Sequence, residues 1–205
     1  MFRRILVAAA MSAALWLGGA PAEAQTQGGE LVIAQPSAPP TLDPHITSAQ
    51  TTLNIVLLVY EQLFTRDDAN QPIGDLADGY DLSEDGLVYT IRLRHGVKFH
   101  DGSDFTAEDA KASLERYERV GGDKAVLEPV TAIDIVDDYT LKVTLGRPVP
   151  PFIEHISFTG SMLAMLPAEQ AVNDTDQNET IGTGPFMFVE HVPDSHVLLR
   201  RFADY

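Results

Sequence analysis

The clearest pattern of apolar and polar residues lies between residues 79 and 117, where it predicts two paired strands followed by a helix. From residue 87 onward every second side chain is apolar, which is typical of a strand with one buried face. Residues 83–86 combine Ser, Asp and Gly, so we expect a hairpin turn there. The side chains predicted on the apolar face of this hairpin are Tyr80, Leu82, Leu87, Tyr89, Ile91 and Leu93.

A helix is predicted to follow this hairpin. After a short third strand around Val97 and Phe99, Thr106 suits the N-cap position of a helix. Glu108 and Asp109 then fall in the first turn, where carboxylates interact favourably with the helix dipole. Apolar residues recur behind them at helical spacing, at Ala107, Ala110, Leu114 and Tyr117.

The N-terminal part of the chain predicts a strand, a proline-rich connection and a helix. Residues 30–34 are mostly apolar and predict a short buried strand. Residues 35–45 contain four prolines, which exclude a helix. Residues 51–64 are apolar on nearly all sides, so we expect a helix buried in a larger core. A tight turn is expected at residues 67–70.

The C-terminal part predicts two more hairpins. Apolar and polar residues alternate from 133 to 145 around a turn at Asp137 and Asp138. Residues 167–172 predict a short helix, and residues 186–190 are expected to pair with 197–201. Local patterns alone therefore indicate an α+β fold.

Composition narrows the class of protein. The chain has 205 residues, a net charge of −16 and no cysteine. Such acidity argues against nucleic acid and against anionic membrane surfaces as partners, because both are bound by clustered Lys and Arg. Without cysteine there are no disulfides, so core burial must stabilise the fold.

The first 24 residues predict a cleavable secretion signal. Arg3 and Arg4 precede an apolar run at 5–17, which is shorter than the ~20 residues of a spanning helix. Ala22 and Ala24 fit the small-x-small cleavage rule, so the mature chain is expected to begin at Gln25. An uncleaved anchor is the alternative. Because a lipid-modified N-terminus needs a cysteine, we expect a soluble periplasmic protein.

Residues 81–110 read DLSEDGLVYTIRLRHGVKFHDGSDFTAEDA. This run resembles the signature of the extracellular solute-binding proteins of peptide/nickel-type ABC importers, family 5, in which S-x-D-G-x-x-Y-x-F-x-L-R-x-G-V-K-F-H-D-G-x-x-F-T-A-x-D is expected. Residues 60–83 and 181–205 resemble the flanking family segments, with Tyr80 where many members carry Trp.

The resemblance implies a periplasmic binding protein of the class II type, with a mixed sheet and antiparallel hairpins. It covers nearly all of residues 25–205 but only the first part of a family member. We therefore expect residues 25–205 to be the N-terminal part of a first lobe, truncated before the second lobe. Were one lobe to supply half of the roughly 8 kcal/mol that corresponds to a Kd of 1 μM, this part alone would bind at about mM. Strand edges without partners are also expected to promote aggregation.

By resemblance, the protein captures a peptide or related small solute between two lobes and delivers it to an ABC permease in the inner membrane. We expect a monomer at full length, with no cofactor and no catalysis. Two alternatives stay open, a periplasmic hydrolase and a solute-sensing receptor subunit without transport. No G-x-S-x-G, S-x-x-K or P-loop supports an enzyme.

Two segments match pocket-lining stretches of the family's first lobe. The first lies at the start of the predicted helix, where free backbone N–H groups can bind carboxylates. The alternative is that its hydroxyls only cap the helix. The second is a loop between apolar runs, for which a buried connector is the alternative. The candidate ligand-binding residues are Thr47, Ser48, Gln50, Thr51, Thr52, Gly160, Ser161 and Met162.

A metal site formed by the protein's own side chains is not expected. His95 and His100 are five residues apart around a predicted turn, so they need not share a face. The sequence contains no cysteine and neither H-x-x-x-H nor H-E-x-x-H.

Overall fold

The computed structural model describes residues 28–157, 162–175 and 180–205, so the predicted secretion signal at 1–24 lies outside the described residues. The chain divides into one unit ending at Ala34 and a second, Gln35–Tyr205, which contains every helix and strand of the described residues. Across the described ranges, no helix combines the length and the apolar character that crossing a membrane requires.

The buried strand predicted at residues 30–34 is wrong. These residues have no strand structure, and Leu31, Val32 and Ile33 are 70–83% exposed. An apolar run becomes a stable strand only where neighbouring strands supply hydrogen-bond partners, so composition alone could not decide this segment.

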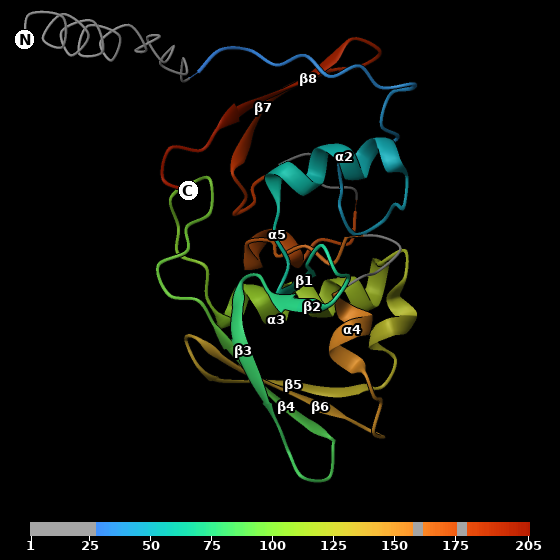
Figure 1. Ribbon diagram of the computed structural model, residues 1–205, viewed down its shortest axis with the longest axis vertical. Helices are drawn as coiled ribbons and strands as arrows, with labels where there is room; N and C mark the ends of the chain where they lie inside the picture. The colour runs from blue at the N-terminus through green and yellow to red at the C-terminus, as the bar shows by residue number, and fades with distance from the viewer. Residues whose placement is uncertain (1–27, 158–161, 176–179) are drawn as a thin grey trace, which may run out of the picture. The chain divides into compact units, whose positions relative to one another are not determined.

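The second unit is built on a four-stranded antiparallel sheet with the order β3-β4-β6-β5 (Figure 1). Its strands are β3 (Ala77–Leu82), β4 (Val88–Leu93), β5 (Val130–Asp137) and β6 (Thr140–Leu145). The hairpins β3–β4 and β5–β6 confirm the two predicted from alternation. Every strand pair in the described ranges is antiparallel, so the mixed sheet implied by the family resemblance is not seen within them.

The buried face of β4 is the predicted one, because Tyr89, Ile91 and Leu93 are all at most 4% exposed. Tyr80 lies opposite Ile91 on the same face, yet it is 41% exposed, and Leu82 is 47% exposed. β3 is one of the two edge strands of the sheet, so a neighbouring strand covers it on one side only. Tyr80 still packs its ring against the rings of Phe64 and Tyr89.

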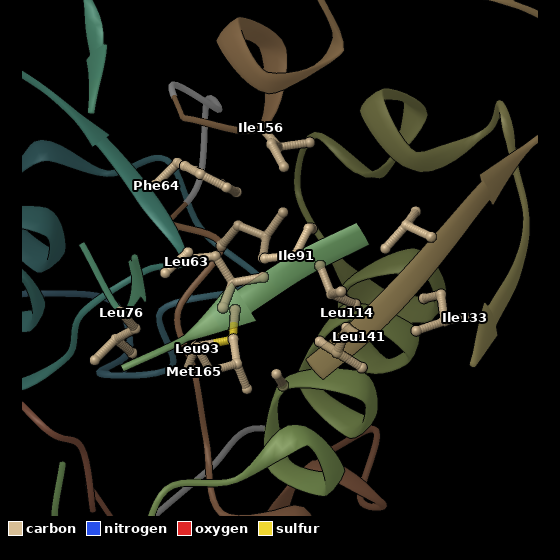
Figure 2. Close-up of a cluster of buried hydrophobic side chains, with 14 of the residues drawn as sticks. Leu63, Phe64, Leu76, Ile91, Leu93, Leu114, Ile133, Leu141, Ile156 and Met165 are labelled. Carbon is tan, nitrogen blue, oxygen red and sulfur yellow. The ribbon is translucent and has the colours of Figure 1, made fainter. Parts of the chain in front are cut away.

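Helix α3 (Ala107–Val120) covers the buried face of the sheet. Figure 2 shows Leu114 of α3 among sheet residues including Ile91, Ile133 and Leu141. The predicted cap at Thr106 is confirmed, because its backbone N–H and its hydroxyl both donate to Asp109 Oδ2, at 2.8 and 2.9 Å. The predicted third strand before α3 is reduced to one isolated bridge.

Replacing Thr106 with alanine is expected to lower the free energy of unfolding by about 1 kcal/mol, because the side-chain half of this capping box is lost. Urea denaturation measures the change. Lys111→Ala, in the middle of the same helix, is the control and should change stability by less than about 0.5 kcal/mol. Equal losses in the two variants would contradict a capping role.

Helix α2 (Gln50–Val59) ends five residues earlier than predicted. From Val59 onward, backbone carbonyl oxygens accept hydrogen bonds from other segments of the chain. Gly184 N–H donates to Val59, Met165 N–H to Glu61 and Leu76 N–H to Gln62, each at 2.9 Å.

Glycine at 182 permits this close approach. A Cβ added there would lie 2.1 Å from the Val59 carbonyl oxygen.

The prediction that helix α2 is buried in a larger core is also wrong. Leu57 is 53% exposed, and the buried face of the helix consists of Thr52, Val56 and Val59.

The predicted turn at residues 67–70 is confirmed, with Asn70 N–H donating to Asp67 O at 2.9 Å and Asn70 at a φ of 61°. The sequence did not predict that the flanking residues pair as β1 (Phe64–Arg66) and β2 (Pro72–Gly74). Each strand is only three residues long, which is too short for a recognisable alternation.

The remaining elements complete the second unit. The 3₁₀ helix η2 (Lys124–Leu127) and α4 (Phe152–Ile156) are short, and α5 (Ala168–Ala171) confirms the predicted helix at 167–172. The final predicted hairpin is confirmed as β7 (Phe186–Val192) and β8 (His196–Arg201). Figure 1 places this hairpin beside α2.

Candidate functional site

The first predicted segment surrounds the N-terminus of α2. Thr47 and Ser48 precede the helix, and its first turn begins at Gln50. The N-cap residue is Ala49, whose side chain cannot accept a hydrogen bond, and the first turn contains no acidic residue. The predicted hydroxyls therefore do not occupy the capping position, and the partial positive charge of this helix end is not neutralised by a carboxylate in its first turn.

The structure divides the residues of this first segment by exposure. Thr52 is buried, and its hydroxyl donates to Thr41 O at 2.6 Å, so it holds the helix to the preceding loop. Thr47 Oγ1 accepts from Ala49 N–H at 3.1 Å. Ser48 and Gln50 are exposed, and Thr51 is half-buried. The Gln50 side chain donates to Asn54 Oδ1 at 2.8 Å along the helix surface.

The second predicted segment is only partly described, because Gly160 and Ser161 lie outside the described residues. Met162 is 5% exposed and packs in one cluster with Val56 and Val59. The structure thus brings Met162 to the buried face of α2. The first turn of the same helix contains Gln50, Thr51 and Thr52 of the first segment.

A buried ionic network that sequence reasoning missed joins α3 to the loop before α2. Asp43 and Arg116 are completely buried, and the two guanidinium NH2 groups donate to the two carboxylate oxygens at 3.1 and 2.6 Å. Asp43 Oδ1 also accepts from His45 N–H at 2.9 Å. This geometry is the bidentate arrangement that gives a buried ion pair its best compensation for lost hydration.

His45 extends the network toward the second segment. Its Nε2 lies 2.8 Å from Ala164 O, which identifies that nitrogen as the protonated one in the neutral ring. Burial lowers the pKa of His45 from its usual 6.5 to about 4, so the ring is neutral near pH 7. The ring of Tyr117 packs against it edge-on at 5.2 Å.

Helix α3 carries a polar stripe that explains how Arg116 becomes buried. Asp109, Ser113 and Arg116 follow one another at helical spacing and are all buried. Asp109 Oδ1 accepts from Ala168 N–H, and Ser113 Oγ accepts from Leu166 N–H. Such a stripe is visible in the sequence, and buried polar groups need partners. Apart from Thr106, which donates to Asp109, the partners of the stripe are 50 or more residues away and could not be identified from the sequence.

The histidines weighed as metal ligands have other contacts. The His95 ring packs on Tyr139, with centroids 3.9 Å apart. His100 Nδ1 accepts from Gly182 N–H at 3.3 Å, and its Nε2 lies 2.9 Å from Gly184 O. Within residues 28–157, 162–175 and 180–205, no three His, Cys, Asp or Glu side chains gather to hold a metal ion.

Comparison with known families matches residues 71–205 to the model described as "Bacterial extracellular solute-binding proteins, family 5 Middle". A curated relative, the glutathione-binding protein GsiB of Pectobacterium atrosepticum, is 32% identical over 206 residues. The match covers 99% of this chain and 39% of that protein. The chain therefore spans about two-fifths of the length of this relative.

Two solved structures resemble this chain. NikZ from Campylobacter jejuni, in complex with Ni(L-His), has a TM-score of 0.70 and 29% identity over 80% of this chain and 34% of its own. DppA from Helicobacter pylori, in complex with the peptide STSA, has a TM-score of 0.71 and 27% identity. That match covers 82% of this chain and 38% of DppA.

Proposed function

The chain belongs to family 5 of the bacterial extracellular solute-binding proteins, and from this premise we propose that it is the solute-binding component of an ABC importer. The observation that carries the proposal is the combined match of residues 71–205 to the family model and of nearly the whole chain to GsiB. The relatives are more than twice as long as this chain. The proposal therefore concerns the activity of a whole family member.

The proposed mechanism is reversible binding followed by closure, without catalysis. A solute occupies the space between two lobes, the lobes close, and the closed form docks on a permease of the inner membrane. A solute favours closure only through its higher affinity for the closed state. The protein would act as a periplasmic monomer, and residues 25–205 would supply part of its first lobe.

The proposed solute is a peptide or a related small molecule that carries a carboxylate. The relatives named above include a glutathione-binding protein and a structure holding a tetrapeptide. The N-terminus of α2 supports this chemistry, because its amides and dipole favour a negative group. Thr47, Ser48, Gln50 and Thr51 would surround that group, and the buried Thr52 would hold the start of the helix in place. Gly160, Ser161 and Met162 are proposed as further ligand-binding residues.

Calorimetric titration of the full-length protein without its signal, using reduced glutathione and a set of tripeptides, tests the proposal. We expect a Kd of about 1 μM for at least one of them. Gln50→Glu should weaken that binding by about tenfold, because it adds a carboxylate beside the proposed one.

Asn54→Asp is the matched control, since it makes the same amide-to-acid change one turn further along α2. Its effect on the Kd should be less than about threefold. Absence of heat with every peptide would reject the solute class, and equal effects of the two substitutions would reject the helix N-terminus as the site.

A further inference from the structure

We propose that Arg116 is a positioning residue, which fixes two segments relative to each other without contacting the solute, namely the loop that leads into α2 and residues 162–175. The effect of Arg116 on solute binding rests on the proposed function. Its structural basis is independent of the solute. Arg116 is fully buried on α3, and its contacts lead toward α2 in one direction and toward residues 162–175 in the other.

The first set of contacts reaches the first turn of α2. Arg116 holds the carboxylate of Asp43 through both guanidinium NH2 groups. Asp43 N–H donates to Thr41 Oγ1 at 2.9 Å, and Thr41 O accepts the hydroxyl hydrogen of Thr52 at 2.6 Å. Two residues of the loop before α2 and one residue of its first turn are thereby tied to the guanidinium.

The second set of contacts reaches the segment that continues from Met162. Arg116 Nε donates to Asn173 O at 2.7 Å, and one NH2 group donates to Thr175 O at 3.1 Å. His45, whose N–H is bound to Asp43, lies 2.8 Å from Ala164 O through its ring. The Arg116 side chain thus connects the carbonyl groups of Asn173 and Thr175 with the loop that leads into α2.

The arrangement requires an arginine. The guanidinium offers five N–H donors in one plane, and here it serves a carboxylate and two carbonyl groups at once. A lysine ammonium at the same position keeps the charge for Asp43 but cannot reach the three acceptor groups in their different directions. Arg116→Lys is therefore expected to preserve the ion pair in part and to release the two segments.

Hydrogen–deuterium exchange of the full chain tests the inference without any solute. In Arg116→Lys we expect amide exchange in residues 47–53 and 162–166 to accelerate at least about tenfold. Exchange in β4 and β6 should change less than about twofold. Asp43→Asn, which keeps the shape of the side chain, should produce the same pattern. Arg119→Lys is the matched control, because Arg119 lies on the same helix with its side chain 42% exposed, and it should leave residues 47–53 unchanged.

Two results would overturn the inference. The first is unchanged amide exchange in both segments. The second is the same acceleration throughout the chain, because that would indicate only a general loss of stability. Titration of each variant with reduced glutathione separates the inference from the proposed function. If the wild-type protein binds, Arg116→Lys should weaken binding at least about tenfold while Arg119→Lys does not. If the wild-type protein does not bind, the proposed solute fails, and the exchange pattern still decides the role of Arg116.

Discussion

Replacing Arg116 with methionine is expected to lower the free energy of unfolding by about 3–5 kcal/mol, because it leaves the Asp43 carboxylate buried without its counter-ion. The carbonyl groups of Asn173 and Thr175 lose a donor in the same substitution. Chemical denaturation near pH 7 measures the change. Methionine is flexible and apolar, and it retains the packing of the aliphatic part of the arginine side chain.

Two comparison variants test whether the loss of stability in Arg116→Met comes from the buried charge of Asp43. Arg119→Met removes a guanidinium that pairs with Asp174 at the surface, and it should cost less than about 1 kcal/mol. Adding Asp43→Asn to Arg116→Met removes the buried charge and should recover part of the lost stability. A double variant as unstable as the sum of its single substitutions would mean that the two residues stabilise the fold independently.

The features that could be predicted from the sequence depend on neighbours along the chain. Thr106 caps α3 as expected, and its partner in the capping box, Asp109, is only three residues away. Tyr89, Ile91 and Leu93 alternate along one strand and face the core as expected. In both cases the determining contact or periodicity lies within one element, so no knowledge of the fold was needed.

The features that could not be predicted depend on residues far apart in the sequence. Where the predicted helix would continue beyond Val59, the chain instead pairs with distant segments, because the N–H groups of residues 184, 165 and 76 donate to the carbonyl groups of Val59, Glu61 and Gln62. No local property of residues 60–64 indicates those partners, and their apolar side chains continue the helical pattern.

The candidate site shows the same division between local and distant contacts. The start of a helix near Thr51 could be predicted, and it lies within one residue of that position. The inward orientation of Thr52 could not, because its acceptor is the carbonyl of Thr41 in the proline-rich connection. The pairing of Asp43 with Arg116 spans 73 residues and is settled only by the packing of α3 against that connection.

Acidification from about pH 7.5 to about pH 4 is expected to destabilise the protein through His45. Burial lowers the pKa of His45 to about 4, whereas in the unfolded chain it returns to about 6.5. Since the unfolded chain binds this proton first, the stabilising contribution is fully present above pH 6.5 and is lost progressively as the pH falls to about 4. The shift corresponds to about 3 kcal/mol.

Other buried groups modify this pH dependence. Burial also lowers the pKa of His100, whose Nδ1 must stay unprotonated to accept from Gly182 N–H, so this residue adds to the loss in acid. Glu61 and Asp75 act in the opposite direction, because burial raises the pKa of both carboxyl groups and the folded chain binds their protons first. The contribution of His45 is therefore isolated by comparing variants rather than from the wild-type profile alone.

His45→Gln separates the contribution of His45, since glutamine retains a donor that can reach Ala164 O but does not titrate. We expect this variant to be less stable than wild type near pH 7.5, and the difference to shrink by about 3 kcal/mol near pH 4. Urea denaturation across this range supplies the measurement. His155→Gln, at an exposed position of α4, should leave the wild-type profile unchanged. A pH profile of His45→Gln parallel to that of wild type would show that protonation of this buried ring does not drive the acid loss.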